Sequence, residues 1–396
     1  SALFSGNSGV SFLGQGFEID TFGFIAIMVL MLSLVPLLLK TKESVFRVHI
    51  ALILSLVVLV LFQGLRLLFG ADFLSFGIFT TPTANLLGKW NDLGIFFGLF
   101  TILSLITLEG LTLHRLSKTI LYGILLISLF FLSVINFMPI WIILGLFALG
   151  FFIYSLLKKK FPFVSSPAGE MREEKRDTGL SFASLFVLVV AIIFVFVGQS
   201  FSDSLNSFFN ISQLEARPSW QSTVAIAQEV YANDALLGSG SNTFSLVWAQ
   251  HKPSVINNTI FWNTDFSAGI GFIPTSFVTS GALGALAWIT FLGLFLLSGF
   301  RYLLLRPVND VYAYYLSLSA FVAALYLWVF TIIYVPIASI ISFAFFFTGI
   351  KVTAYRPITN MSGIKRIDTV IVKDLPGISI SRRPKPNISK AYIIKI

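Results

Sequence analysis

Four basic side chains carry most of the chemistry that this sequence offers: Arg217, Lys252, Lys89 and Arg66. Arg217 stands directly before Pro218, a residue that suits the first position of a helix. A helix start presents free backbone N–H groups and the positive end of the helix dipole, and an adjacent arginine adds a bidentate donor for phosphate. The four cations therefore predict a receptor for an anion such as a diphosphate. The competing interpretations are arginines that snorkel to lipid headgroups and, for Lys89, a loop charge beside an interfacial tryptophan.

A proton acceptor on the same side would have to be a carboxylate or an imidazole, and the candidates are Asp265, His251, Asp234, Glu229 and Glu215. Asp265 is favoured because flanking aromatic residues would desolvate it and raise its pKa. His251 is the second choice. A solvated loop carboxylate and a structural histidine are the competing interpretations. With three scattered histidines and no cysteine, the sequence predicts neither a metal site nor a cofactor.

The composition excludes a soluble globular domain. Only 11% of the 396 residues are charged, 56% are hydrophobic, and the mean hydropathy is +0.88, whereas soluble domains carry about 25% charged residues. A helix needs about 20 apolar residues to cross a membrane. We therefore predict an all-α, polytopic transmembrane bundle with about nine spans over residues 1–350. The predicted spans are Phe22–Leu39, Val48–Phe69, Leu93–Leu108, Thr119–Phe137, Ile140–Leu157, Leu180–Gly198, Ser276–Ser298, Val311–Thr331 and Ile332–Ile350.

The basic residues predict the orientation, because cytoplasmic segments of membrane proteins are enriched in Lys and Arg. All but four of the 27 basic residues fall between spans on one side or in a basic tail, 351–396. This pattern predicts a cytoplasmic tail and an outer loop at 199–271. Because the basic residues cluster beside apolar runs, no nucleic-acid partner is predicted. The chain begins without methionine, so we also expect spans upstream of it.

The outer loop, Gln199–Gly271, is predicted to be functional, because loops of this length are usually functional or disordered and this one is rich in aromatic residues. Within it, Pro218–Asn233 is predicted to form an amphipathic helix. Its apolar stripe would consist of Trp220, Val224, Ala227 and Tyr231.

Four short motifs are shared with a known family: Gly88-Lys-Trp-Asn91, Arg217-Pro-Ser-Trp220, Leu236-Leu-Gly-Ser-Gly-Ser-Asn-Thr-Phe244 and Gly281-Ala-Leu-Gly284. In this order, the chain resembles the O-antigen ligase and polymerase superfamily of bacterial membrane glycosyltransferases. The resemblance implies Arg217 as a catalytic residue, and Lys89 and Asn91 at the substrate. The sequence departs from the family at Ile270, Gly271 and Thr279, where many ligases carry a His-Asn pair and a glutamate.

This resemblance predicts transfer of a glycan from a polyprenyl diphosphate to an acceptor hydroxyl at the outer face. The expected partners are the lipid-linked glycan, membrane lipid and the glycan acceptor, and the expected location is a bacterial inner membrane. Trp220 and Trp262 are then expected to stack on a sugar or to hold the lipid. Two alternatives stay open: a transporter or flippase of a lipid-linked or apolar solute, and a non-catalytic membrane scaffold derived from the ligase fold. Transporters usually place ionisable groups near the middle of the membrane, and the predicted spans carry few. The absent histidine keeps the scaffold open.

Overall fold

The computed structural model describes residues 1–6, 8–14, 16, 18–111, 113–160, 182–211, 215–305 and 311–355. Across these ranges the chain is helical and contains no strand. The prediction of an all-α protein is therefore confirmed. The predicted basic tail lies outside the described residues from position 356 onward.

Each of the nine predicted apolar runs contains a helix within the described residues, although Tyr334–Ile337 of the run Ile332–Ile350 form a connection between two helices. The helices are α2 (Phe22–Leu38), α3 (Lys42–Phe69), α4 (Trp90–Gly110), α5 (Arg115–Ile135), α6 (Met138–Lys160), α7 (Phe182–Phe208), α10 (Phe272–Leu305), α11 (Val311–Ile333) and α12 (Ala338–Tyr355). Within the described ranges, seven of them are long and apolar enough to cross a membrane, whereas α2 and α12 are shorter apolar helices. The structure thus supports a multi-pass membrane protein.

Helix is the expected backbone here, because lipid offers no hydrogen-bond partner and an α-helix satisfies its own N–H and C=O groups. Burial separates inner from peripheral helices. The apolar windows of α4 and α11 are each 72% buried inside the protein, whereas that of α10 is only 11% buried. Leu286, Ile289 and Leu297 of α10 are more than 60% exposed, a pattern that suits a lipid-facing surface.

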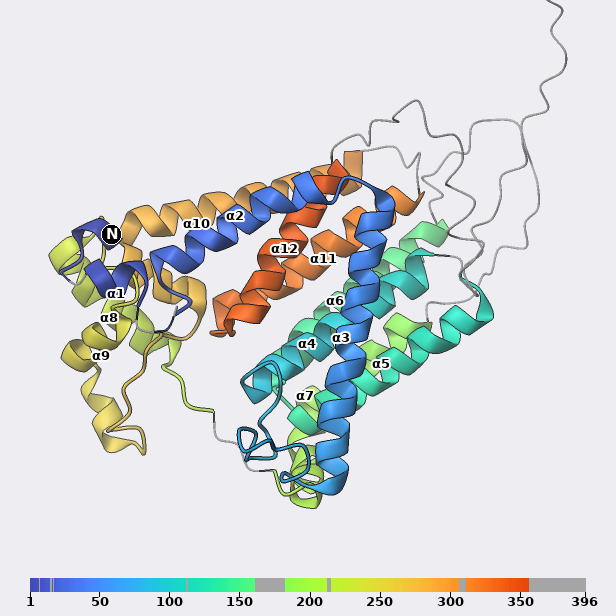
Figure 1. Ribbon diagram of the computed structural model, residues 1–396, viewed down its shortest axis with the longest axis horizontal. Helices are drawn as coiled ribbons and strands as arrows, with labels where there is room; N and C mark the ends of the chain where they lie inside the picture. The colour runs from blue at the N-terminus through green and yellow to red at the C-terminus, as the bar shows by residue number, and fades with distance from the viewer. Residues whose placement is uncertain are drawn as a thin grey trace, which may run out of the picture.

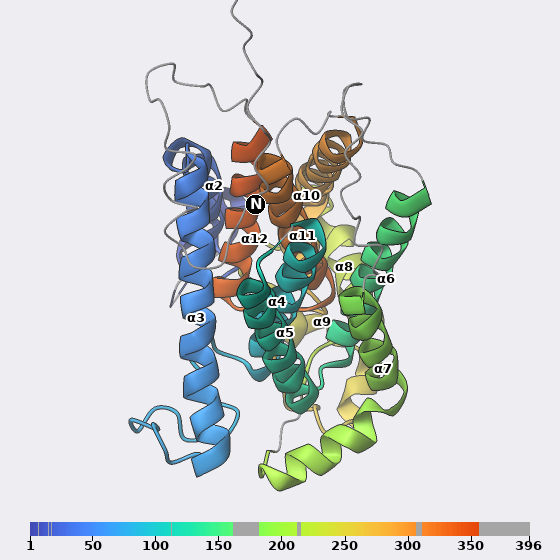
Figure 2. The ribbon, with the colours of Figure 1, turned by 90° about the vertical axis from the view of Figure 1, so that its right-hand side faces the viewer.

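The bundle has two ends of different character. Figure 2 shows α3 at one edge, α6 and α7 at the other, and α4, α5 and α11 between them. In Figure 1 the ends of α6, α10 and α12 gather at one end of the bundle, and the start of α4 lies toward the opposite end. The second end also carries the connection from α11 to α12. The candidate site is built there.

The segment between α7 and α10 forms a small helical unit with its own core. It contains α8 (Trp220–Asp234), α9 (Phe244–His251) and the short 3-10 helix η2 (Ser254–Asn258), which lie beside the start of α10 (Figure 1). The core of this unit consists of Ile226, Val230, Phe244, Val247, Trp248, Phe266 and Val278. Three aromatic residues of the predicted loop, Phe244, Trp248 and Phe266, are therefore buried in one core together with Val278 of α10.

Two predictions about α8 were wrong. Pro218 is not the first helical residue, because Ser219 is the N-cap and its side chain accepts a hydrogen bond from the Ser222 N–H. The buried face runs through Thr223, Ile226 and Val230, whereas Trp220 and Val224 are about half exposed. The helix is rotated from the predicted stripe because Thr223 also accepts a hydrogen bond from the Ile270 N–H, 2.9 Å away, just before α10.

The limits of the predicted loop also change. Helix α7 continues ten residues past the predicted end at Gly198, as far as Phe208. Helix α10 starts at Phe272, four residues before the predicted Ser276, and contains one residue with non-helical angles, Gly281.

The N-terminal segment reaches the α8–α9 unit. It contains the 3-10 helix η1 (Ala2–Phe4) and the short helix α1 (Ser8–Phe12) before α2. Its two ends contact the turn before α9: the hydroxyls of Ser1 and Ser241 lie 3.4 Å apart, and the Asn242 N–H donates to the Asp20 carboxylate.

Candidate functional site

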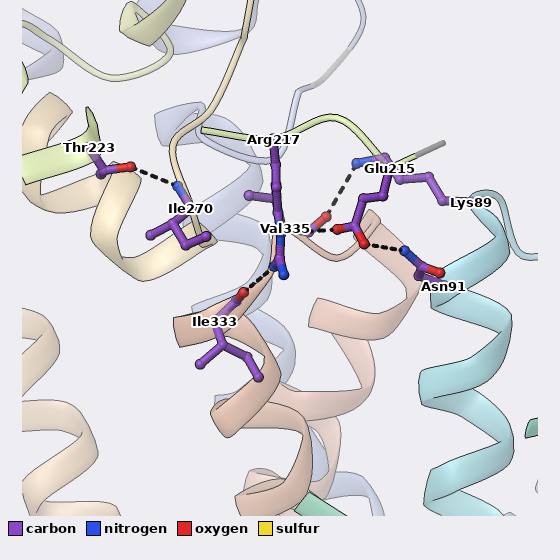
Figure 3. A network of polar contacts seen from close by, with 8 residues as sticks. All are labelled: Lys89, Asn91, Glu215, Arg217, Thr223, Ile270, Ile333 and Val335. Carbon is purple, nitrogen blue, oxygen red and sulfur yellow. Dashed lines mark hydrogen bonds and ion pairs between the residues drawn. The ribbon is translucent and has the colours of Figure 1, made fainter. Parts of the chain in front are cut away.

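Arg217 and Lys89 converge on the end of α11 and the connection that follows it, Tyr334–Ile337. Arg217 donates from Nη1 to the carbonyl oxygen of Ile333, 2.6 Å away, and Lys89 donates from Nζ to that of Val335, 3.3 Å away (Figure 3). Free carbonyls at a helix C-terminus attract cations. The contact of Arg217 with Ile333 is therefore also a good C-terminal cap for α11.

Glu215 bridges Arg217 to α4. One carboxylate oxygen, Oε1, lies 3.2 Å from Nε of Arg217, and the other, Oε2, accepts a hydrogen bond of 3.0 Å from Nδ2 of Asn91 (Figure 3). The side chains of Arg217 and Glu215 are 29% and 27% exposed. Burial raises the pKa of Glu215, while Arg217, Asn91 and Lys89 act in the opposite direction.

Aromatic rings lie beside the two cations. The guanidinium carbon of Arg217 lies 5.6 Å from the ring centroid of Phe137 and 5.9 Å from that of Tyr334, and Nζ of Lys89 lies 5.7 Å from the Tyr334 centroid. Such contacts contribute about 0.5–2 kcal/mol each. Tyr334 is buried, and this burial raises the pKa of its hydroxyl. It therefore keeps its proton and serves as a neutral neighbour of the cations.

Asp92 is fully buried in the first turn of α4, close to Lys89 and Asn91 in the sequence. Its Oδ1 accepts a hydrogen bond from the Ile337 N–H, 3.2 Å away. Its Oδ2 is buried and has no hydrogen-bond partner within the part of the chain that the structure describes. An acid in the first turn suits the positive end of a helix dipole. Hereafter Lys89, Asn91, Asp92, Glu215, Arg217 and Tyr334 are called the Arg217 cluster.

The structure brings together three of the predicted site residues, Arg217, Lys89 and Asn91. Of their new neighbours, Glu215 was only a minor candidate. Asp92 was overlooked although it ends the Lys-Trp-Asn-Asp sequence next to an apolar run, a signal that could have identified it. Tyr334 gave no signal, because it lay within the predicted span Ile332–Ile350.

Arg66 does not share the cluster. Its Nη1 donates to the Phe73 carbonyl at 3.1 Å and its Nη2 to the Thr81 carbonyl at 2.7 Å, and it lies beside the Phe62 and Phe79 rings. The side chain is 2% exposed. The prediction of four converging cations was therefore wrong: Arg66 lies apart from the cluster and donates two hydrogen bonds to backbone carbonyls of the loop after α3.

The residues at the tip of the α8–α9 unit also lie outside the cluster. Lys252 donates from Nζ to the Trp262 carbonyl, 2.7 Å away and ten residues further along the same segment. His251, partly buried, ends α9, and Trp262 is 58% exposed. The predicted desolvation of Asp265 was wrong, because its side chain is exposed. Among the described contacts none links these residues to Arg217.

The two glycine motifs lie face to face. The amides of Ser239 and Gly240 donate to the carbonyls of Val278 and Thr279, and the amides of Ala282 and Leu283 donate to those of Ala235 and Leu236. This pairing of 235–240 with 278–283, hereafter the glycine junction, has Gly238 and Gly281 at its centre, both with positive φ. A Cβ on either glycine would lie 2.5 Å from the other's backbone nitrogen. The junction therefore needs both glycines, and it positions α8 beside α10.

A further carboxylate lies at the glycine junction. Oδ2 of Asp20 accepts hydrogen bonds from the Thr279 hydroxyl at 2.9 Å and from the Asn242 N–H at 3.2 Å. Burial raises the pKa of Asp20 to about 6. Asp20 thus brings a carboxylate from the N-terminal segment to the glycine junction.

Within the described ranges, no group of three or more His, Cys, Asp or Glu side chains is arranged to hold a metal ion. Comparisons of the chain with protein-family models, with curated proteins and with solved structures give no match. Its function has to follow from the chemistry of these residues.

Proposed function

We propose that the chain is a membrane glycosyltransferase of the O-antigen ligase and polymerase kind. It would transfer a glycan from a polyprenyl diphosphate to an acceptor hydroxyl. The observation that carries the proposal is the convergence of Arg217 and Lys89, two cations from distant parts of the sequence, beside the partly exposed carboxylate of Glu215. Two fixed cations match the charge of a diphosphate, and a carboxylate beside them can accept a proton.

The proposed topology has nine membrane crossings, with α2 and α12 crossing as well as the seven longer helices. The Arg217 cluster and the α8–α9 unit then face the outside of a bacterial inner membrane, and the basic segments face the cytoplasm. What supports this orientation is the distribution of Lys and Arg. A polyprenyl diphosphate in the outer leaflet would meet the cluster at the membrane surface.

In the proposed reaction, the acceptor oxygen attacks the anomeric carbon of the donor sugar and forms the new C–O bond. The bond between that carbon and the diphosphate oxygen breaks, and the diphosphate leaves with the electron pair. Arg217 and Lys89 stabilise the charge that grows on the diphosphate; removal of one such group costs about 10²–10³ in rate. Glu215 takes the hydroxyl proton. Trp220, about half exposed at the start of α8, would stack on a sugar.

The test uses purified protein in lipid nanodiscs, with a polyprenyl-diphosphate-linked glycan and a hydroxyl acceptor. Arg217→Ala should lower transfer by about 100-fold or more. The matched control is Arg301→Ala, because Arg301 is exposed near the opposite end of the bundle, on α10. Translocation of the donor without transfer would instead identify a flippase, and neither activity would indicate a scaffold. Normal transfer by Arg217→Ala would remove the cluster from the mechanism.

A further inference from the structure

The contact between Glu215 and Arg217 is an ion pair without an aligned hydrogen bond. Nε of Arg217 and Oε1 of Glu215 are 3.2 Å apart, yet this oxygen makes no hydrogen bond within the described residues. Strong arginine–carboxylate pairs are usually hydrogen-bonded and often bidentate. Here charge and closeness along the chain hold the pair, since Ala216 alone separates the two residues.

Polar groups from two other elements also face Glu215. From α4, Asn91 donates a hydrogen bond to Oε2, Lys89 lowers the energy of the ionised form, and Asp92 repels it. From the connection between α11 and α12, the Tyr334 hydroxyl interacts electrostatically with the same carboxylate. The carboxylate thus lies among donors and cations that would suit any anion of similar size.

We propose that Glu215 is an internal substitute for the diphosphate, so that binding of the donor displaces this carboxylate from Arg217. The inference rests on the proposed function and adds how the same site binds its ligand. A diphosphate offers more charge and more acceptor oxygens than a carboxylate, so it can hydrogen-bond the guanidinium where Glu215 does not. Once displaced, Glu215 is free to accept the hydroxyl proton during transfer.

If the diphosphate displaces Glu215, binding of the diphosphate and transfer of the glycan should depend on pH in opposite directions. Burial raises the pKa of Glu215. As the pH falls through this raised pKa, Glu215 becomes neutral and stops competing, so the diphosphate binds more tightly. Transfer needs the ionised carboxylate, so its rate falls over the same pH interval. A side chain that merely stabilised the fold would not produce this crossing of the two profiles.

The experiment compares wild-type protein with Glu215→Gln in nanodiscs, with farnesyl diphosphate and inorganic pyrophosphate as probes. The matched control is Glu229→Gln, because Glu229 is an exposed glutamate on α8. At pH 8, Glu215→Gln should bind the diphosphate about three- to tenfold more tightly than wild type, the range expected when one partly exposed charge stops competing. The ratio of the two affinities should approach one at low pH. Taking this ratio cancels the titration of the probe itself.

The outcomes separate the displacement from the proposed function. Equal affinities and parallel pH profiles for wild type and Glu215→Gln, with diphosphate bound by both, would overturn the displacement and leave the proposed function standing. Weaker binding by Glu215→Gln would also overturn it. No binding by either protein would overturn both proposals. If Glu215→Gln gains affinity for pyrophosphate as well as for farnesyl diphosphate, the site recognises the diphosphate alone. If it gains affinity only for farnesyl diphosphate, the site recognises a diphosphate that is joined to a lipid chain. If Glu215→Gln does not fold, Glu215→Ala removes the same carboxylate.

Discussion

Replacement of Gly281 by alanine should open the glycine junction. Gly281 has φ 66° and ψ −163°, a region that is essentially restricted to glycine and costs other residues about 1–3 kcal/mol. An added Cβ would also lie 2.5 Å from the Gly238 nitrogen and 2.5 Å from the Leu236 carbonyl oxygen. Both neighbours are backbone atoms, so neither can rotate away as a side chain could.

This clash can be relieved only if residues 235–240 and 278–283 move apart. Separation weakens the neighbouring hydrogen bonds, from Ala282 to Ala235 at 2.9 Å and from Leu283 to Leu236 at 3.2 Å, and each such bond contributes about 1 kcal/mol. Together with the strain, the expected cost of Gly281→Ala is about 3–5 kcal/mol, confined to the contact between α8 and α10. Arg217 precedes α8, so transfer should fall as well.

Hydrogen–deuterium exchange of peptides covering 235–240 and 278–283 measures this effect locally, and an unfolding curve in detergent measures it globally. The control is Gly293→Ala, because a Cβ at Gly293 meets nothing within 4 Å. This second variant should be neutral or stabilising by about 0.5–1 kcal/mol, since alanine is the better helix former. If Gly281→Ala shows the same exchange and stability as Gly293→Ala, the two segments of the junction are not in such close contact.

Two further variants separate stability from activity. Arg66→Leu leaves the Phe73 and Thr81 carbonyls without their donor and should cost about 1–3 kcal/mol in an unfolding curve, while transfer per folded molecule stays normal; loss of transfer at unchanged stability would instead put Arg66 in the site. Asp20→Asn should flatten the pH dependence of unfolding: the pKa of Asp20 is raised from 3.8 to about 6 in the folded chain, so its stabilising contribution is complete below pH 3.8 and lost as the pH rises through 6. The apparent melting temperature of Asp20→Asn should therefore gain on wild type between pH 4 and 7, and a constant difference across this range would contradict the assignment.

Several features could be predicted from the sequence because their causes are local. Apolar runs of sufficient length form helices wherever they lie, and each of the nine runs contains one within the described residues. Basic residues are scarce in the predicted outer segments, and this scarcity indicates Arg217 and Lys89 from the sequence alone. The predicted apolar stripe of α8 was wrong, because the rotation of this helix depends on its packing against α10 and on the hydrogen bond from the Ile270 N–H to Thr223.

The sequence by itself determined an all-helical membrane protein, since composition and the length of apolar runs decide which solvent surrounds the chain. Only the tertiary structure decided which charges share a site. Lys89 and Val335 are 246 positions apart, and Arg217 and Ile333 are 116 apart, so no spacing rule could join them. Conversely, Arg66 lies outside the site because carbonyls only 7 and 15 residues away accept hydrogen bonds from its two terminal nitrogens. Charges are placed by whatever partners the fold brings within hydrogen-bond distance, and those partners are set by helix packing.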